Sequence, residues 1–107
     1  MGNQPLVNGE DGSFQLIRLE GGPALGLRFN LMKASFLVVK VAKGYVMCGY
    51  LNMETADKLG DCAGRVSGVA NFEALLDAKI NAVSMAAKER GLHEGMSARE
   101  FLNALAD

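Results

Sequence analysis

The chain carries, at residues 36–50, the segment FLVVKVAKGYVMCGY. Residues 36–42 place apolar side chains on both faces of an extended strand, and residues 45–50 do the same after the break at Lys43-Gly44. The two stretches therefore predict neighbouring strands joined by a hairpin. Helices need to cover only one face of an antiparallel sheet, so the second apolar face predicts a surface that another subunit buries.

Two further strands are predicted before this hairpin. Residues 14–19 are rich in apolar side chains, a Gly-Gly-Pro break follows at 21–23, and residues 24–31 alternate apolar and small or polar side chains with a period of two. The four strands predict an antiparallel meander. Residues 1–12 are polar and glycine-rich and are expected to form a flexible leader before a single domain at 13–107.

The second half of the chain alternates glycine turns with short helical patterns. A short strand is expected within residues 61–69, and Gly91 is placed to end a helix. Four residues are candidate helix N-caps: Asn52, Asn71, Asn81 (for a helix running to about Arg90) and Ser97, which forms a capping box with Glu100. The predicted fold is α+β, with an antiparallel meander of about four strands, packed by three to four short helices, that oligomerises through the sheet.

Four segments carry a family resemblance. Residues 43–52, 63–69, 72–76 and 94–100 together resemble the YunC-like family, domain of unknown function 1805, over roughly residues 14–105. The resemblance implies an α+β fold whose N-terminal β region mediates formation of a tetramer. It implies no catalytic residues, because the family carries no established activity.

Composition excludes several classes of protein. The 107 residues are 50% hydrophobic and 21% charged with a net charge of −1, so the chain lacks the basic surface that binds nucleic acid or an anionic membrane. No apolar run approaches the ~18–20 residues of a membrane-spanning helix, and the N-terminus lacks a secretory pattern. Cys48, Cys62 and His93 have no metal-ligand spacing, so no metal or cofactor is predicted. Reduced thiols and a cytoplasmic location are expected.

Cys48 is the first candidate for chemistry. A reactive thiolate requires a nearby base, cation or helix N-terminus, and the helix expected after Asn52 supplies such an end. His93, the single imidazole, would be the base if the fold brought it to Cys48. The alternatives are that Cys48 is a small buried apolar side chain and that His93 lies solvated in a loop.

The glycine-bracketed Arg65 is the second candidate. Gly64, Arg65 and Gly68 would offer backbone N–H groups and a guanidinium to a small anion such as phosphate or carboxylate. The alternative is that the glycines serve turns and close packing while Arg65 pairs with a carboxylate. Asp57 and Asp61, four residues apart, are expected on a solvated helix face.

The sequence thus predicts a small cytoplasmic protein that self-assembles through its N-terminal sheet. No residue pattern demonstrates catalysis. Two alternatives remain open: a module that binds a small anion or metabolite at Gly64, Arg65 and Gly68, and a cysteine-dependent enzyme that uses Cys48.

Overall fold

The first half of the chain forms four consecutive antiparallel strands in the computed structural model, which describes residues 12–30, 35–49 and 52–107. Each strand pairs with the next, and the strands are β1 (Gly12–Leu19), β2 (Gly22–Asn30), β3 (Ser35–Val41) and β4 (Gly44–Cys48). The predicted antiparallel meander is confirmed. Gly12, expected in the leader, already belongs to β1, and the rest of that predicted leader lies outside the described residues.

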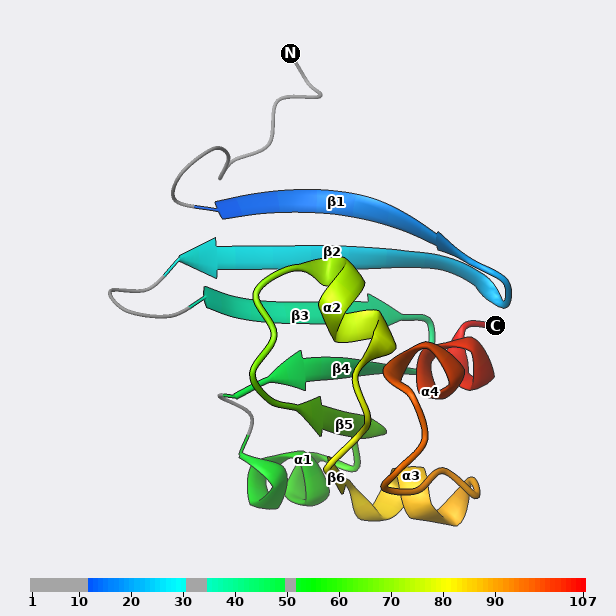
Figure 1. Cartoon of the computed structure of the whole chain (residues 1–107). Coiled ribbons are helices and arrows are strands. Elements are labelled where there is room, and N and C mark those ends of the chain that lie inside the picture. Colours follow the sequence, from blue (N-terminus) through cyan, green and yellow to red (C-terminus); the bar gives the residue numbers. More distant parts are fainter. Residues whose placement is uncertain (1–11, 31–34, 50–51) are drawn as a thin grey trace.

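Two short strands extend the four-stranded meander to a sheet of six described strands; one of them lies within residues 61–69, where a short strand is expected, and the other is not predicted. β5 (Ala63–Val66) runs parallel to β4, and β6 (Ala82–Val83) pairs antiparallel with β5. The helix α1 (Met53–Leu59) lies in the connection from β4 to β5, because parallel neighbours require a crossover. The described strands form one mixed sheet and keep their chain order from β1 to β6 (Figure 1).

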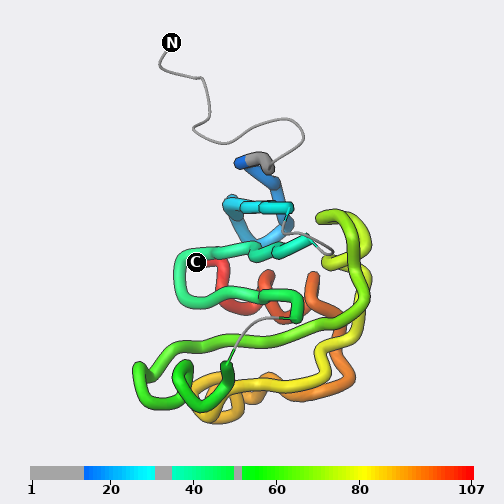
Figure 2. Tube along the Cα trace, turned by 90° about the vertical axis from the view of Figure 1, so that its left-hand side faces the viewer, coloured from blue at the N-terminus to red at the C-terminus, as the bar shows by residue number. Residues whose placement is uncertain are grey.

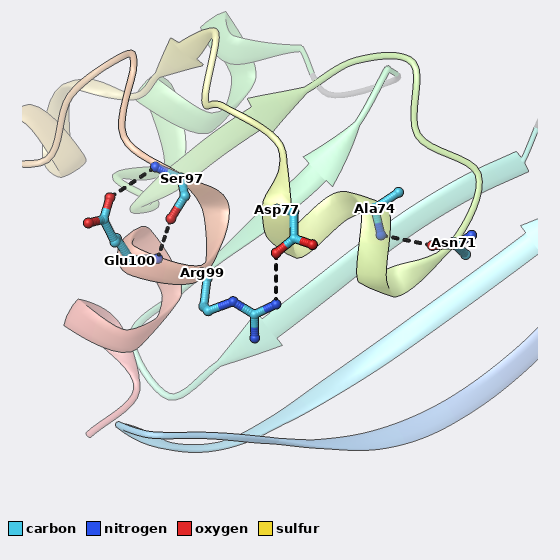
Figure 3. A network of polar contacts seen from close by, with 6 residues as sticks. All are labelled: Asn71, Ala74, Asp77, Ser97, Arg99 and Glu100. Atoms are coloured by element: carbon cyan, nitrogen blue, oxygen red, sulfur yellow. Dashed lines mark hydrogen bonds and ion pairs between the residues drawn. The ribbon is translucent and has the colours of Figure 1, made fainter.

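Three of the four predicted helix caps are confirmed. The side chain of Asn52 accepts hydrogen bonds from the first turn of α1, and that of Asn71 caps α2 (Phe72–Asp77). Ser97 and Glu100 form the predicted capping box at the start of α4 (Ala98–Leu105), as Figure 3 shows. These side chains satisfy backbone N–H groups that have no partner inside a helix.

The helix predicted to start at Asn81 is wrong in its N-terminal part. Residues 82–83 are β6, and α3 (Met85–Glu89) begins after the N-cap Ser84. The reason is the edge of β5, whose carbonyl groups need donors. The backbone N–H groups of Asn81 and Ser84 donate to the carbonyl oxygens of Arg65 and Ala63 at 2.8 and 2.9 Å.

Helices α2 and α4 pack on the same side of the sheet (Figures 1 and 2). An exposed salt bridge of 2.9 Å joins Arg99 of α4 to Asp77 of α2 (Figure 3). The helix α4 contacts β3, β4 and β5 and buries Phe101, Leu102 and Leu105 in the core. None of the described helices is long and apolar enough to cross a membrane.

The opposite side of the meander, here called the outer face, exposes apolar side chains. Its two cross-strand rows are Phe14–Leu27–Val38–Met47 and Leu16–Leu25–Lys40–Tyr45. Phe14, Leu16 and Leu25 are 50%, 58% and 44% exposed. A groove of about 370 Å³ runs between these rows. Val38, Tyr45 and Met47 of β3 and β4, the strands whose second apolar side the sequence predicts, lie on this face but are half-buried, and its most exposed apolar side chains belong to β1 and β2.

Candidate functional site

The turn between β3 and β4 meets the start of β5 at one end of the sheet (Figure 1). Gly44 makes this approach possible, because a Cβ there would lie 2.5 Å from the carbonyl oxygen of Cys62. The N–H of Tyr45 donates to that same carbonyl at 3.1 Å. Because Gly44 has no side chain, the hairpin can lie directly against residues 60–62.

A phenol–carboxylate pair lies in this corner. The hydroxyl of Tyr45 donates a hydrogen bond of 2.8 Å to Oδ2 of Asp61. Burial, this hydrogen bond and the negative charge of Asp61 raise the pKa of Tyr45 to about 12. Tyr45 therefore remains a protonated hydrogen-bond donor at neutral pH.

A cavity of about 390 Å³ opens beside the pair, and we call it the turn pocket. Lys40 and Lys43 line it from the β3–β4 hairpin, Asp61 from the segment before β5, and Arg90 from the end of α3. Three cationic groups and one carboxylate leave the lining with a net charge of +2. Such a lining favours anions.

Ser84 fixes the backbone behind Asp61. Its side chain is completely buried, and its hydroxyl donates to the carbonyl oxygen of Asp61 at 2.6 Å. Oγ of Ser84 in turn accepts hydrogen bonds from the N–H groups of Ala63 at 3.0 Å and Ala87 at 3.3 Å. One hydroxyl therefore joins the start of β5 to the start of α3.

Cys48 lies in the core and is 4% exposed. Its sulfur accepts a hydrogen bond from the N–H of Leu37 at 3.3 Å and donates to the carbonyl oxygen of Ser35 at 3.6 Å. These contacts are those of a small apolar side chain that uses neighbouring backbone groups. A catalytic role for Cys48 stays a prediction.

His93 lies in the loop between α3 and α4 and is exposed. Its Nδ1 is 2.9 Å from the carbonyl oxygen of Glu94. Within the described ranges no hydrogen bond joins this ring to Cys48, so the structure does not bring the two candidates together as a bonded pair.

Gly64 and Arg65 lie in β5, and Gly68 lies in the bend beyond it. A Cβ at Gly64 would come within 3.0 Å of the Ile80 side chain, which is the close packing that the alternative interpretation expects. Nε of Arg65 donates to Oδ1 of Asn81 at 3.1 Å. A ligand at these three residues stays a prediction.

The turn pocket was missed because its residues are far apart in the sequence. The pairing of Asp57 and Asp61 on one helix face is wrong, because α1 ends at Leu59. Asp57 instead accepts a hydrogen bond of 2.7 Å from the N–H of Met85 at the start of α3. For the turn pocket, the one signal in the sequence was Lys-Gly-Tyr at 43–45, because a glycine in a strand marks a close approach of another backbone segment.

Known proteins resemble nearly the whole chain. The family model described as Domain of unknown function (DUF1805) matches residues 47–105. The chain belongs to the DUF1805 family. The DUF1805 chain is 39% identical over 90 residues to the uncharacterized protein YunC of Bacillus subtilis (strain 168), an alignment that covers 80% of this chain and 89% of YunC. The predicted family membership is confirmed.

A solved structure shares the fold. The crystal structure of a protein of unknown function from Thermoplasma acidophilum matches the DUF1805 chain with a TM-score of 0.86 and 35% sequence identity. The match covers 95% of this chain and 100% of the chain from Thermoplasma acidophilum. The α+β architecture is therefore shared with that solved structure, and neither relative's name states an activity.

Proposed function

We propose that this DUF1805 protein acts as a cytoplasmic homo-oligomer, a tetramer, that assembles through the outer face of its sheet. The observation that supports the proposal is the row of exposed apolar side chains on β1 and β2. Leu16 and Phe14 are each at least half exposed, although most large apolar side chains elsewhere in the described chain are buried. An apolar patch of several hundred square ångströms typically marks an interaction surface.

The dimensions of the outer face suit a second copy. Four strands spaced about 4.8 Å apart, with roughly seven residues each at about 3.3 Å, give a face of roughly 450 Å². Two such faces bury about 900 Å² before the relief of the side chains is counted, close to the ~1,000 Å² of a specific interface. Two sheets packed face to face interdigitate their side chains in this way.

The charge of the outer face also favours a copy of the same chain. Lys40 is the one charged residue in its two rows, and Arg18 is the next charged residue on the same side of β1, so the apolar centre of the face carries no acidic group and one basic group. The ammonium of Lys40 donates to the carbonyl oxygen of Val41 at 3.3 Å, toward the end of its own strand. An isologous pair can therefore bring apolar rows together, and pairs of pairs make a tetramer.

The test is the mass of the assembly in solution. Light scattering during size-exclusion chromatography at low micromolar concentration should give about four protomers for the wild type. Leu25→Glu should lower the mass, because it buries a charge in the interface. Leu59→Glu is the matched control, since Leu59 is 70% exposed on α1 and lies outside the outer face. A stable wild-type monomer, or unchanged assembly of Leu25→Glu, would refute the proposal.

A further inference from the structure

We propose that the turn pocket binds a small phosphate ester, with its three cations around the phosphate and Asp61 accepting a hydrogen bond from a hydroxyl of the same ligand. This site goes beyond self-assembly, and it is separate from the predicted anion site at Gly64, Arg65 and Gly68. It rests on the charge, the size and the hydrogen-bonding capacity of the pocket.

The first argument is uncompensated positive charge. The salt bridge between described residues joins Arg99 and Asp77, which lie elsewhere. In the described part of the chain, no carboxylate oxygen therefore lies within 4.0 Å of the cationic nitrogens of Lys40, Lys43 or Arg90. Cations around a cavity that have no such partners keep donors for charge-assisted hydrogen bonds, which are stronger than neutral ones, to an oxyanion.

The second argument is the match in charge. A phosphate ester carries about −1.5 to −2 at neutral pH, which balances the +2 of the lining. A ligand whose only charged group is one carboxylate would leave half of the +2 of the lining unbalanced. Lys40 uses one of its three donors on the carbonyl oxygen of Val41, so two remain for a ligand.

The third argument is the carboxylate of Asp61. Its Oδ2 accepts from Tyr45, whereas Oδ1 has no hydrogen-bond partner among residues 12–30, 35–49 and 52–107. Because Tyr45 donates from a fixed position, the carboxylate is oriented before a ligand arrives. A free Oδ1 beside three cations suits a ligand that presents a hydroxyl near its phosphate.

The size of the pocket limits the ligand. A cavity of about 390 Å³ lies at the lower end of the range for small-molecule sites. It therefore suits a phosphorylated polyol or a similarly small ester.

The experiment is a titration of the full chain, followed by two-dimensional NMR, with glycerol phosphate, inorganic phosphate and glycerol at constant ionic strength. Glycerol phosphate should bind more tightly than phosphate, and glycerol should not bind. Lys43→Gln and Arg90→Gln should each weaken glycerol phosphate binding by at least about tenfold, the lower end of the loss for a hydrogen bond to a charged group. Lys88→Gln, an exposed change in α3 outside the pocket, should leave binding unchanged.

Asp61→Asn separates the two halves of the site. Phosphate should bind the variant at least as tightly as the wild type, because a negative charge has been removed, while the advantage of glycerol phosphate over phosphate should disappear. Unchanged binding in both Lys43→Gln and Arg90→Gln, or shifted resonances away from the pocket, would overturn the proposal. Lys43 and Arg90 lie outside the rows of the outer face, whereas Lys40 and Tyr45 belong both to those rows and to the pocket. The mass of the Lys43→Gln and Arg90→Gln samples therefore tests self-assembly separately.

Discussion

Replacing Ser84 with alanine tests the structural link behind the turn pocket. The change removes a buried hydroxyl that caps α3 and also holds β5. Loss of the cap costs about 1 kcal/mol. The N–H of Ala63, completely buried, loses its acceptor, which costs about 1–3 kcal/mol more. The carbonyl of Asp61 lies in a half-buried residue, so water can replace its donor.

The expected loss for Ser84→Ala is therefore about 2–4 kcal/mol in the free energy of unfolding. In a chain of 107 residues this lowers the melting temperature by at least about 8 °C. Circular dichroism during urea and thermal unfolding measures both quantities. All proteins must be compared at one protomer concentration, since assembly makes the melting temperature depend on concentration.

Ser97→Ala is the matched control, because Ser97 also caps a helix but is only half-buried, and its hydroxyl accepts from Glu100 in the first turn of α4 and joins no second element among the described residues. It should cost about 1 kcal/mol. If Ser84→Ala destabilises the protein no more than Ser97→Ala does, the hydroxyl does not join β5 to α3 as described.

Two further predictions concern the phenol and the buried thiol. The folded-state pKa of Tyr45, raised to about 12 from 10.0, favours the neutral phenol in the fold, so its contribution to stability should be fully present below pH 10 and be lost as the pH rises toward 12. Tyr45→Phe should lack this decline in pH-dependent urea unfolding, and an identical decline in both proteins would contradict it. Cys48, being buried, should resist brief exposure to iodoacetamide at neutral pH and react in urea, as read by mass spectrometry. Rapid labelling of the native protein at Cys48 would instead favour a reactive thiol.

Local signals in the sequence predicted much of the fold. Asn52, Asn71 and Ser97 cap helices as expected, because an N-cap depends on residues only two or three positions away. The first four strands follow from the period of their apolar residues. Asn81 has an equally suitable side chain, yet it donates to β5, an element that lies elsewhere in the sequence.

The candidate site could not be predicted in the same way. Lys43, Asp61 and Arg90 line one cavity only because β5 runs parallel to β4 and α3 follows β6. Parallel pairing has no local signature in a strand of four residues. Cys48 and Arg65 attracted attention because their residue types are chemically active, although their partners in the structure are backbone groups and Asn81.

The chain order of the strands also determines how the nascent protein folds. Every strand of the described sheet pairs with its neighbour in sequence, and contacts of this kind favour rapid folding. The helix α4 follows all six strands, yet it packs on β3, β4 and β5, and the carbonyl oxygen of Leu105 accepts from the N–H of Lys43 at 3.0 Å. During synthesis the strands can therefore pair one after another while the apolar side that α4 covers stays open. The core can close only after α4 has left the ribosome, so until then this side exposes apolar surface of the kind that promotes aggregation.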